Sequence, residues 1–522
     1  MGDHGDQDVR DVTDDQREPA EQAARQAARL ADLAELERAF PDGVAGKRIH
    51  AVGAGGHGIS AGLLLAHAAG ALVTGCDRTP TSLGQMLEEA GIPIAIGHDN
   101  SHVVGADLVV TNPAVTFLFP DHPELLAAQA LGIPVAQWQP LLGLLMRGHI
   151  GVSVAGVHGK GSTSALIGAM LIAAELDPTV EVGDIVRAWD SNVRPGKGRY
   201  FVNEADEFNY NFLSYHPRVV TLTEVEYDHP EFFRSYEEIR DAFAQFLRGM
   251  DLSDMTPITE GAPPPTIVTS ADSSGCRDTV AQLGADWPGV VRTFSVEGGK
   301  ADAEARAVRE GERTSFELLL DGRSLGRVTL RQPGRHNVAN AVAAAATASV
   351  LGVAPEVIVR TIEEFDGLRR RFEITEDGDV VWVDDYAHHP HAVALTIAAA
   401  RQRFPGRRLV AIFQPTLYTR LQRFLTPFAE ALATADEVVV VEIQPSRERD
   451  TGIIHGNDLV RAVQAQPSFA HKPQAARYGG DFPATAALLN QLRQPGDVLL
   501  VMGSGPVNQV IGLAREAYTA GA

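Results

Sequence analysis

A lysine surrounded by glycines lies between an apolar segment and a helix-forming segment, at residues 156–163. Backbone N–H groups in such a turn can hold phosphate oxygens together with the lysine, and a hydroxyl that follows can bind Mg²⁺. The spacing departs from the usual phosphate-binding loop, because the first glycine is displaced and a glycine follows the lysine. We predict a nucleotide phosphate site; a glycine turn with a solvated lysine is the alternative. The residues of the turn are Gly156, Val157, His158, Gly159, Lys160, Gly161, Ser162 and Thr163.

Acidic residues stand at the ends of two further predicted strands, in the sequences YFVNEADE and RVVTLTEVEYDH. In an open parallel sheet, ligands bind at the carboxyl ends of the strands, and Mg²⁺ prefers hard oxygen ligands. Any one of these acids alone is typical of a solvated loop, but two clusters beside a phosphate loop predict a metal site. The residues are Glu204, Asp206 and Glu207 in the first cluster, and Glu226, Asp228 and His229 in the second.

A second glycine cluster, GAGGHG at residues 53–58, also lies between a predicted strand and a predicted helix. Glycines there let the backbone approach a diphosphate at the start of the helix. Asp77, at the end of the next predicted strand, is placed to bind a ribose hydroxyl. Similar loops bind NAD, FAD or no ligand, so this cluster alone also fits an NAD-dependent oxidoreductase. That alternative does not explain Lys160 or the paired carboxylates.

Strand-like and helix-like segments alternate from Lys47 to the end of the chain, which predicts an α/β fold with mainly parallel sheets. Within the second unit, the sequence TSFELLLDGRSLGRVTL predicts a β-hairpin about its Asp-Gly pair. The elements that must position the chemical residues thus group into successive α/β units. We expect an extension over residues 1–45 and three units over residues 46–148, 149–352 and 353–522.

The first 40 residues differ from the rest of the chain. Residues 1–20 are acidic and polar, which predicts disorder. Residues 20–40 contain helix formers and a leucine stripe, which fits either a helix on the first unit or a solvated extension. The stripe consists of Leu30, Leu33 and Leu36.

Composition limits the possible partners and the compartment. Among 522 residues, 45 are basic and 67 acidic, and the net charge of −22 favours neither nucleic acid nor an anionic membrane as a partner. The two cysteines, Cys76 and Cys276, are too few for a disulfide framework or a metal cluster, and they indicate a reducing compartment. The N-terminus lacks the features of a signal peptide, and no apolar run reaches about 18 residues. We therefore predict a cytoplasmic protein without a membrane span.

Eight motifs occur in the order and spacing of the Mur ligases, and the chain resembles this family over about residues 47–510. The motifs DDYAHHP and FQPTLYTR are typical of the branch that adds L-alanine to UDP-N-acetylmuramate. The resemblance implies three domains: a Rossmann-like domain for the UDP-sugar, a central ATPase domain of the P-loop type, and a Rossmann-like C-terminal domain that closes over the site. The other motifs are GAGGHGIS, GVHGKGST, NEADE, EVEYDH, GRHNVANAVAA and GLRRRFE.

The resemblance also assigns roles to residues already singled out. The UDP diphosphate would bind Gly53, Gly55, Gly56, His57, Gly58 and Asp77. The phosphates of ATP would bind the turn at residues 156–163, and Glu204 and His229 would bind Mg²⁺ with Ser162 or Thr163. The adenine would meet His336, Asn337 and Asn340. Residues of the closing domain would reach the nucleotide and the amino acid: Arg370 or Arg371, Asp385, Tyr386, His388 and Arg420. The catalytic set would be Lys160, Glu204, His229, His388 and Arg420.

The implied reaction activates the lactyl carboxylate of UDP-N-acetylmuramate as an acyl phosphate, which L-alanine then converts to an amide. A neutral His388 or His229 would help to deprotonate the incoming ammonium. Family members that use another amino acid or a recycled peptide remain alternatives, as does a non-catalytic nucleotide-binding homologue, and both a monomer and a homodimer fit the sequence. No lysine occurs between Lys197 and Lys300, so we expect no carbamylated lysine at a second metal.

Overall fold

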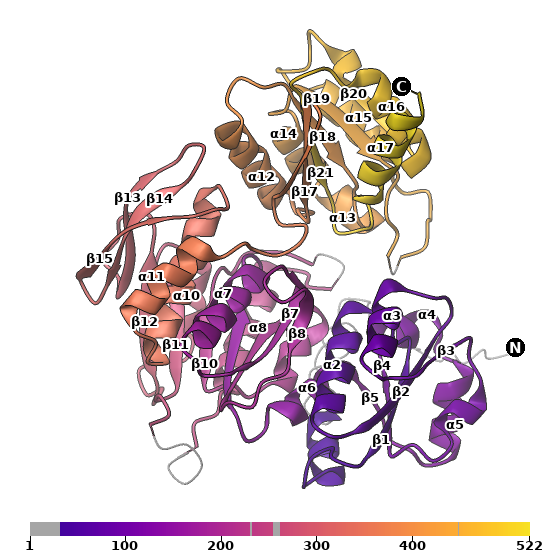
Figure 1. Ribbon diagram of the computed structural model, residues 1–522, viewed down its shortest axis with the longest axis vertical. Helices are drawn as coiled ribbons and strands as arrows, with labels where there is room; N and C mark the ends of the chain where they lie inside the picture. The colour runs from indigo at the N-terminus through magenta and orange to yellow at the C-terminus, as the bar shows by residue number, and fades with distance from the viewer. Residues whose placement is uncertain (1–31, 230–231, 254–260, 447, 522) are drawn as a thin grey trace, which may run out of the picture.

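The computed structural model describes residues 32–229, 232–253, 261–446 and 448–521, which form three α/β units (Figure 1). The units are built on sheets of five, ten and six strands, which confirms the predicted α/β fold. Residues 32–39 are helical, and Leu36 packs in the core of the first unit. For the described part of this segment, residues 32–40, the first of the two interpretations, a helix on the first unit, is confirmed. Leu30 and the predicted disorder of residues 1–20 fall outside the described residues.

The first unit has a parallel sheet in the order β3-β2-β1-β4-β5. Its strands are β1 (Arg48–Val52), β2 (Leu72–Asp77), β3 (Ile94–Ile96), β4 (Leu108–Thr111) and β5 (Val135–Gln137). Its helices are α2 (His57–Ala68), α3 (Ser82–Glu89), η1 (Asn100–Val103), α4 (Pro113–Leu118), α5 (Pro123–Ala130) and α6 (Trp138–Met146).

The central unit has the sheet order β15-β14-β13-β12-β11-β10-β6-β9-β7-β8. Three neighbouring pairs in it are antiparallel: β7 with β8, β13 with β14, and β14 with β15. The hairpin predicted about Asp321-Gly322 is present as β14 and β15. Its strands are β6 (Ile150–Ala155), β7 (Thr179–Val186), β8 (Ser191–Arg194), β9 (Tyr200–Ala205), β10 (Val219–Leu222), β11 (Thr266–Ser270), β12 (Val290–Ser295), β13 (Ala303–Arg309), β14 (Ser315–Leu320) and β15 (Arg323–Thr329). Its helices are α7 (Lys160–Ala173), η2 (Phe208–Ser214), α8 (Tyr236–Arg248), α9 (Ser274–Ala281), α10 (Arg335–Val350) and α11 (Pro355–Glu364).

The C-terminal unit has the order β16-β17-β21-β18-β19-β20, with β16 antiparallel. Its strands are β16 (Glu373–Asp377), β17 (Val380–Asp385), β18 (Leu409–Phe413), β19 (Glu437–Val441), β20 (Ala476–Gly480) and β21 (Val498–Met502). Its helices are α12 (Pro390–Arg403), α13 (Tyr418–Arg423), α14 (Leu425–Leu432), α15 (Gly456–Gln464), η3 (Pro473–Ala475), α16 (Phe482–Leu492) and α17 (Gln509–Gly521).

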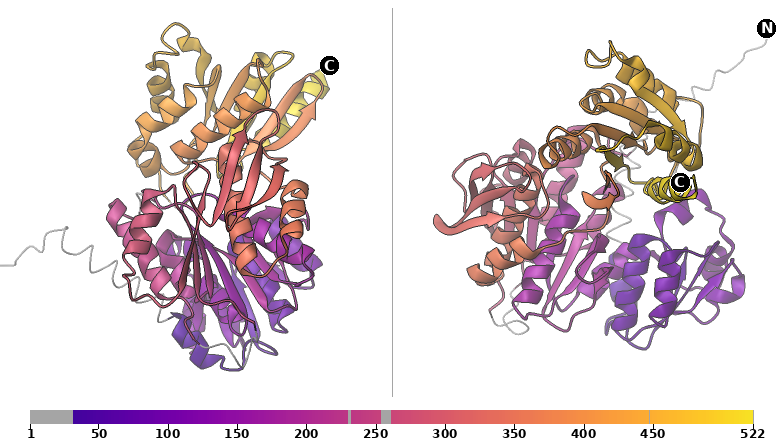
Figure 2. Two further views of the ribbon diagram at one scale, coloured as in Figure 1. Left: turned by 90° about the vertical axis from the view of Figure 1, so that its left-hand side faces the viewer. Right: turned by 45° about the horizontal axis from the view of Figure 1, so that its top comes forward.

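The order of strands in the central sheet determines which loops meet. Strand β6 lies between β10 and β9 and pairs parallel with both. The segments that follow these three strands therefore leave the same edge of the sheet side by side. The C-terminal unit lies above the central unit in Figures 1 and 2, and Arg371 pairs with Asp184 between them at 2.8 Å. Among the described residues, no helix is both long and apolar enough to cross a membrane.

Candidate active site

The glycine turn at residues 156–163 joins the fully buried strand β6 to helix α7. Gly159 caps the helix with φ +79°, and no side chain caps its first N–H groups. A Cβ on Gly159 would also lie only 2.3 Å from Oδ1 of Asn340. The uncapped N–H groups at a helix start form a site for anions, because they carry the positive end of the helix dipole.

Lys160 lies at the first position of α7 with its side chain turned toward the sheet. Its Nζ donates to the Gly156 carbonyl and to Oε2 of Glu207, each at 2.8 Å. Burial opposes the charge, but the carboxylates of Glu207, Asp206 and Glu204 outweigh it and raise the pKa of Lys160. The ammonium is therefore charged and held in place, and the solvated-lysine alternative does not fit its 12% exposed side chain.

Asp206, Glu207 and His229 bring three possible metal ligands within 4.8 Å of one another. Oε1 of Glu207 is buried, has no hydrogen-bond partner among the described residues and lies 3.4 Å from Nε2 of His229. Burial and the neighbouring Glu207 raise the pKa of Asp206, whereas Lys160 and His229 overcome burial and lower the pKa of Glu207 to about 2. Adjacent carboxylates of this kind, one buried and one half-buried, suit a cation.

Glu204, predicted as a metal ligand with His229, lies in the same cavity but outside this group. Its Oε2 accepts a hydrogen bond from the N–H of Gly183 at 2.8 Å. A Cβ on Gly161 would lie 3.1 Å from the same oxygen. A side chain at position 161 would therefore be in tight contact with Glu204.

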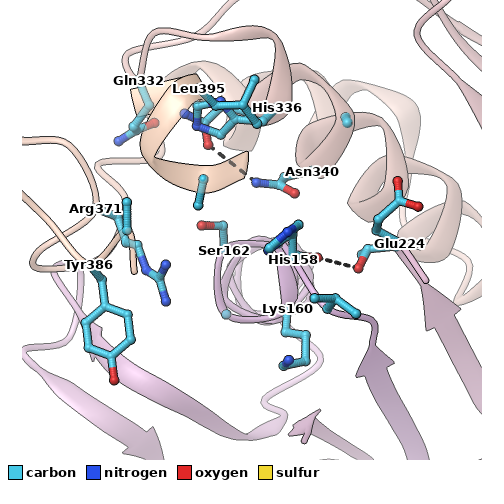
Figure 3. A pocket seen from close by; sticks show the side chains of 18 of the residues that line it. His158, Lys160, Ser162, Glu224, Gln332, His336, Asn340, Arg371, Tyr386 and Leu395 are labelled. Atoms are coloured by element: carbon cyan, nitrogen blue, oxygen red, sulfur yellow. Dashed lines mark hydrogen bonds between the residues drawn. The ribbon is translucent and has the colours of Figure 1, made fainter. Parts of the chain in front are cut away.

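The two hydroxyls at the start of α7 have different surroundings. Ser162 lines the cavity, and its side chain points into the space above Lys160 in Figure 3. Thr163 is fully buried, and its Oγ1 lies 3.5 Å from Oδ1 of Asn340. A ligand in the cavity can therefore reach Ser162 but not Thr163.

Helix α10 presents a polar face to the cavity through His336, Asn337 and Asn340. The amide of Asn340 donates to Oδ1 of Asn337 at 3.4 Å. Burial, with some repulsion from His158 and Arg371, lowers the pKa of His336 to about 4. This face is neutral, and it suits an uncharged polar ring better than a phosphate.

The C-terminal unit contributes Arg371, Asp385, Tyr386 and His388 to the cavity wall. The guanidinium of Arg371 lies 4.8 Å from the centre of the Tyr386 ring. The neighbouring Arg370, one of the two arginines predicted to reach the nucleotide, instead donates to the carbonyls of the loop at 503–505 and does not line the cavity. Asp385 accepts hydrogen bonds from two backbone N–H groups and a threonine, so it organises this segment.

His388 and Arg420 differ in how they reach the site. Nδ1 of His388 lies 3.0 Å from the Tyr386 carbonyl, which can only accept, so this nitrogen carries the proton and Nε2 keeps a lone pair. Burial and Arg420 lower the pKa of His388 to about 3, so the ring is neutral. Arg420 is buried and donates to Asp228 at 3.1 Å, and it lies 3.2 Å from Nδ1 of His229. Arg420 therefore connects α13 to the group of possible metal ligands that contains His229.

A second group of possible metal ligands joins the loop to the C-terminal unit: the sequence pointed to His158 and Glu226, but not to their meeting with His389. Nε2 of His158 lies 2.5 Å from Oε1 of Glu226, and Nδ1 of His389 lies 3.8 Å from the same oxygen. The adjacent His391 stacks on His158 with ring centres 5.6 Å apart. The second histidine of the DDYAHHP motif was the available signal, but only the fold shows that it meets the loop.

The other glycine loop, at residues 53–58, starts α2 and does not line this cavity. Oδ2 of Asp77, predicted to bind a ribose, accepts a hydrogen bond from the Gly55 N–H at 2.9 Å. A Cβ on Gly55 would lie 2.3 Å from Oγ1 of Thr81, and one on Gly58 would lie 2.3 Å from the Trp138 ring. Gly53 has φ +76°, Gly56 is the N-cap of α2, and the carbonyl of His57 accepts from Asn192 at 3.0 Å.

The cavity of about 580 Å³ between the central and C-terminal units is large enough for a nucleotide-sized ligand. Its wall has a cationic and acidic end at Lys160 and a neutral polar face on α10. Glu224 also lines it, with its carboxylate accepting from the Ser273 hydroxyl. The arrangement fits a triphosphate held at one end and a ring held at the other.

Three segments match the parts of one protein family. Residues 48–150 match the Mur ligase family, catalytic domain; residues 154–348 match the Mur ligase middle domain; and residues 370–505 match the Mur ligase, glutamate ligase domain. A UDP-N-acetylmuramate–L-alanine ligase of Caldanaerobacter subterraneus is 35% identical over 469 residues, which cover 89% of this chain and 96% of that protein. The ligase of that name from Oleidesulfovibrio alaskensis is 35% identical and covers 88% of this chain and 96% of its own length.

Solved structures of similar proteins agree with this match. The UDP-N-acetylmuramate–alanine ligase of Thermotoga maritima has a TM-score of 0.73 and 27% identity, covering 91% of this chain and all of that one. A UDP-N-acetylmuramate:L-alanyl-gamma-D-glutamyl-meso-diaminopimelate ligase from Neisseria meningitides has a TM-score of 0.54 and 27% identity, covering 62% of this chain and all of that one.

Proposed function

The chain belongs to the Mur ligase family of ATP-dependent amide ligases, and on that premise we propose that it joins L-alanine to the lactyl carboxylate of UDP-N-acetylmuramate in peptidoglycan synthesis. The observation that carries the proposal is the meeting of Lys160 and its carboxylates with Arg371, Tyr386 and His388 of another unit in one cavity. The named L-alanine ligases that match nearly the whole chain support the choice of amino acid.

ATP binding follows from the two ends of the cavity. The N–H groups of α7 and the ammonium of Lys160 hold the phosphates, and the α10 face with Asn337 and Asn340 holds the adenine. Lys160 exchanges its contact with Glu207 for a phosphate oxygen when ATP enters. Arg371 adds a second positive charge from the C-terminal unit.

The residues beside Lys160 fit Mg²⁺, because one buried oxygen of Glu207 makes no hydrogen bond within the described part of the chain and Asp206 lies in the same group. We assign Asp206, Glu207 and His229 as the residues that would hold the ion, with Glu204 and Ser162 also facing the cavity. A bound Mg²⁺ would supply neutralisation of the phosphate charge. Arg420 keeps His229 and Asp228 in position from the far side.

In the first step, an oxygen of the lactyl carboxylate attacks the γ-phosphorus, the bond to the β–γ bridging oxygen breaks, and ADP leaves with its electron pair. The product is an acyl phosphate. Transfers of this kind depend on positioning and charge stabilisation more than on proton transfer. Lys160 supplies both, because its ammonium is held charged by three carboxylates and fixed by the Gly156 carbonyl.

In the second step, the amine of L-alanine attacks the acyl carbon, the bond to the phosphate oxygen breaks, and inorganic phosphate leaves as the amide forms. The ammonium must first lose one proton to solvent, and a second proton passes from the nitrogen to the departing phosphate as the amide forms. His388 offers a lone pair on Nε2, but its low pKa makes it a hydrogen-bond acceptor that orients the amine rather than a strong base. Closure of the C-terminal unit over the cavity would exclude water that hydrolyses the acyl phosphate.

A second candidate substrate is a recycled peptide in place of L-alanine. The Neisseria meningitides structure, a ligase for a tripeptide by its name, has the same 27% identity to this chain as the Thermotoga maritima structure. A peptide needs a longer channel for its remaining residues than a single amino acid does. The two substrates share the first step, so they differ only in the amine that is accepted.

The test is phosphate release from ATP by the full chain with UDP-N-acetylmuramate and Mg²⁺, with and without each amine. We expect L-alanine to give the largest kcat/KM and the tripeptide L-Ala-γ-D-Glu-meso-diaminopimelate to give little. The reverse order would replace L-alanine by the peptide. No stimulation by L-alanine, glycine, L-serine or the peptide would overturn the ligase proposal and favour a non-catalytic nucleotide-binding protein.

A further inference from the structure

A cluster of histidine, cysteine and glutamate side chains lies in the first unit, and none of them lines the active-site cavity. His50 is on β1, Cys76 on β2, His102 on η1 and Glu124 in the first turn of α5. One ligand atom from each of the four lies within 4.8 Å of the others. The cluster fills the space between one face of the sheet and the segments η1 and α5.

Glu124 is the centre of the cluster and is completely buried. Its Oε2 accepts from the Cys76 thiol at 2.9 Å and lies 3.6 Å from Nε2 of His50. Its Oε1 lies 2.9 Å from Nδ1 of His102. Nδ1 of His98 is also close, at 3.3 Å from the Cys76 sulfur. Five donor groups from separate parts of the chain thus converge on one point.

His50 shows that hydrogen bonding does not complete this arrangement. The residue is 3% exposed, and its Nδ1 lies 2.9 Å from the hydroxyl of Thr74. Its Nε2 is buried, makes no hydrogen bond to the described residues and faces Glu124. Buried polar atoms in proteins are almost always partnered. A second-sphere contact on one ring nitrogen with the other nitrogen aimed at the cluster is the usual arrangement of a metal-binding histidine.

We propose that His50, Cys76, His102 and Glu124 bind one Zn²⁺ ion. Imidazole, thiolate and carboxylate are the ligands that Zn²⁺ takes, and bonds of about 2.1 Å in a tetrahedron place ligand atoms about 3.4 Å apart. The separations of 2.9 and 3.6 Å around Glu124 bracket that value. Two neutral histidines, a thiolate and a carboxylate make the site neutral with Zn²⁺, which suits a buried position.

Zn²⁺ would replace the proton that the Cys76 thiol now donates to Glu124. The side chains of His98 and His102 are 24% and 25% exposed, which provides a route from solvent. Four protein ligands close the coordination shell, so the role is structural. The ion ties η1 and α5 to β1 and β2. The two cysteines predicted no metal cluster by their number, but one cysteine suffices when the fold supplies histidines and a glutamate.

The first test measures metal bound to the full chain by mass spectrometry after expression with added Zn²⁺ and removal of loose ions. We expect about one Zn²⁺ per chain. Cys76→Ser and His50→Gln should each weaken Zn²⁺ affinity more than about 100-fold, since even outer partners of metal ligands affect affinity by up to that factor. Cys276→Ser and His67→Gln, at the other cysteine and at an exposed histidine of α2, are the matched controls and should keep the ion.

Equal Zn²⁺ content in Cys76→Ser and Cys276→Ser, or no Zn²⁺ in the unmodified chain, would overturn the proposal. A second measurement does not depend on the folding of variants. The unmodified chain loaded with Co²⁺ should show a thiolate-to-metal charge-transfer band, which bound Zn²⁺ prevents. Absence of the band at saturating Co²⁺ would also overturn the proposed Zn²⁺ site, and the cluster would then be a hydrogen-bonded network around Glu124.

Discussion

The glycine loop at residues 53–58 and the one at residues 156–163 each join a parallel strand to a helix whose N-cap is a glycine without a side-chain cap. Beside the first loop, Asp77 accepts a hydrogen bond from the loop itself. Around the second, Lys160 meets three carboxylates, and the C-terminal unit covers the site. The same local structure can hold phosphates in both places, but only the second loop has the charges that a phosphoryl transfer needs.

The largest effect is expected when the positive charge of the second loop is removed. Lys160→Ala should lower kcat for phosphate release about 10³-fold, because it removes a fixed positive charge from the transferring group. Lys197→Ala, at an exposed lysine of the same unit, is the control. Steady-state kinetics would measure kcat of both variants. Thermal unfolding would show whether the carboxylates that lose the Lys160 ammonium destabilise the fold. Full turnover by Lys160→Ala would contradict the prediction, because the second loop would then bind phosphate without a catalytic charge, as is proposed for the first loop.

The next effect separates the two hydroxyls of the second loop. Ser162→Ala should lower kcat about 10²-fold and raise the Mg²⁺ concentration needed for half-maximal rate, because Ser162 faces the cavity. Thr163→Val keeps the shape of a fully buried side chain and should leave the Mg²⁺ dependence unchanged. Measuring the rate against Mg²⁺ concentration for both variants would distinguish the two hydroxyls. A changed Mg²⁺ dependence in Thr163→Val but not in Ser162→Ala would assign the metal contact to Thr163.

A smaller effect tests the first loop as a holder of substrate. Gly55→Ala places a Cβ 2.3 Å from Oγ1 of Thr81 and should raise KM for UDP-N-acetylmuramate about 10-fold with kcat nearly unchanged. Gly62→Ala, in helix α2 directly after the loop, meets nothing closer than 4.0 Å and is the matched control. A loss in kcat alone would show that the first loop also takes part in the chemistry.

The smallest effect concerns pH and the histidines near the second loop. His388 has a pKa of about 3 in the folded chain against an ordinary 6.5, so below pH 6.5 the unfolded chain binds the additional proton. Its contribution to stability is complete above pH 6.5 and is lost as the pH falls toward 3. His388→Gln should therefore reduce the fall in Tm between pH 7 and 5 by about 2–4 °C. His67→Gln, at an exposed histidine, should leave the fall unchanged, and equal falls in both variants would contradict the prediction.

Much of the site could be predicted because its parts are local. The turn around Lys160, the helix with His336, Asn337 and Asn340, and the acids after β9 and β10 are each encoded in a short stretch. Apolar periodicity and glycine position are sufficient to predict strands, turns and helices. The shared edge of the sheet then follows from the parallel order.

Contacts between distant segments were not predictable in the same way. The motif GLRRRFE did not reveal that Arg371 rather than Arg370 lines the cavity, because that depends on the direction of the chain between two units. Nor did it follow from the sequence that Asp206 and Glu207, and not Glu204, group with His229. One residue's shift along a loop turns a side chain from the cavity to the backbone.

By itself, the sequence determined the three α/β units, the two glycine loops and the family, since all of these depend on residues that are near one another in the chain. Only the tertiary structure decided that Ser162 faces the cavity and that His50, Cys76, His102 and Glu124 meet. The physical reason is that sheet order and helix packing, not spacing along the chain, determine which side chains approach. Two strands of similar sequence can be neighbours or lie at opposite edges, and the side chains they carry meet only in the first case.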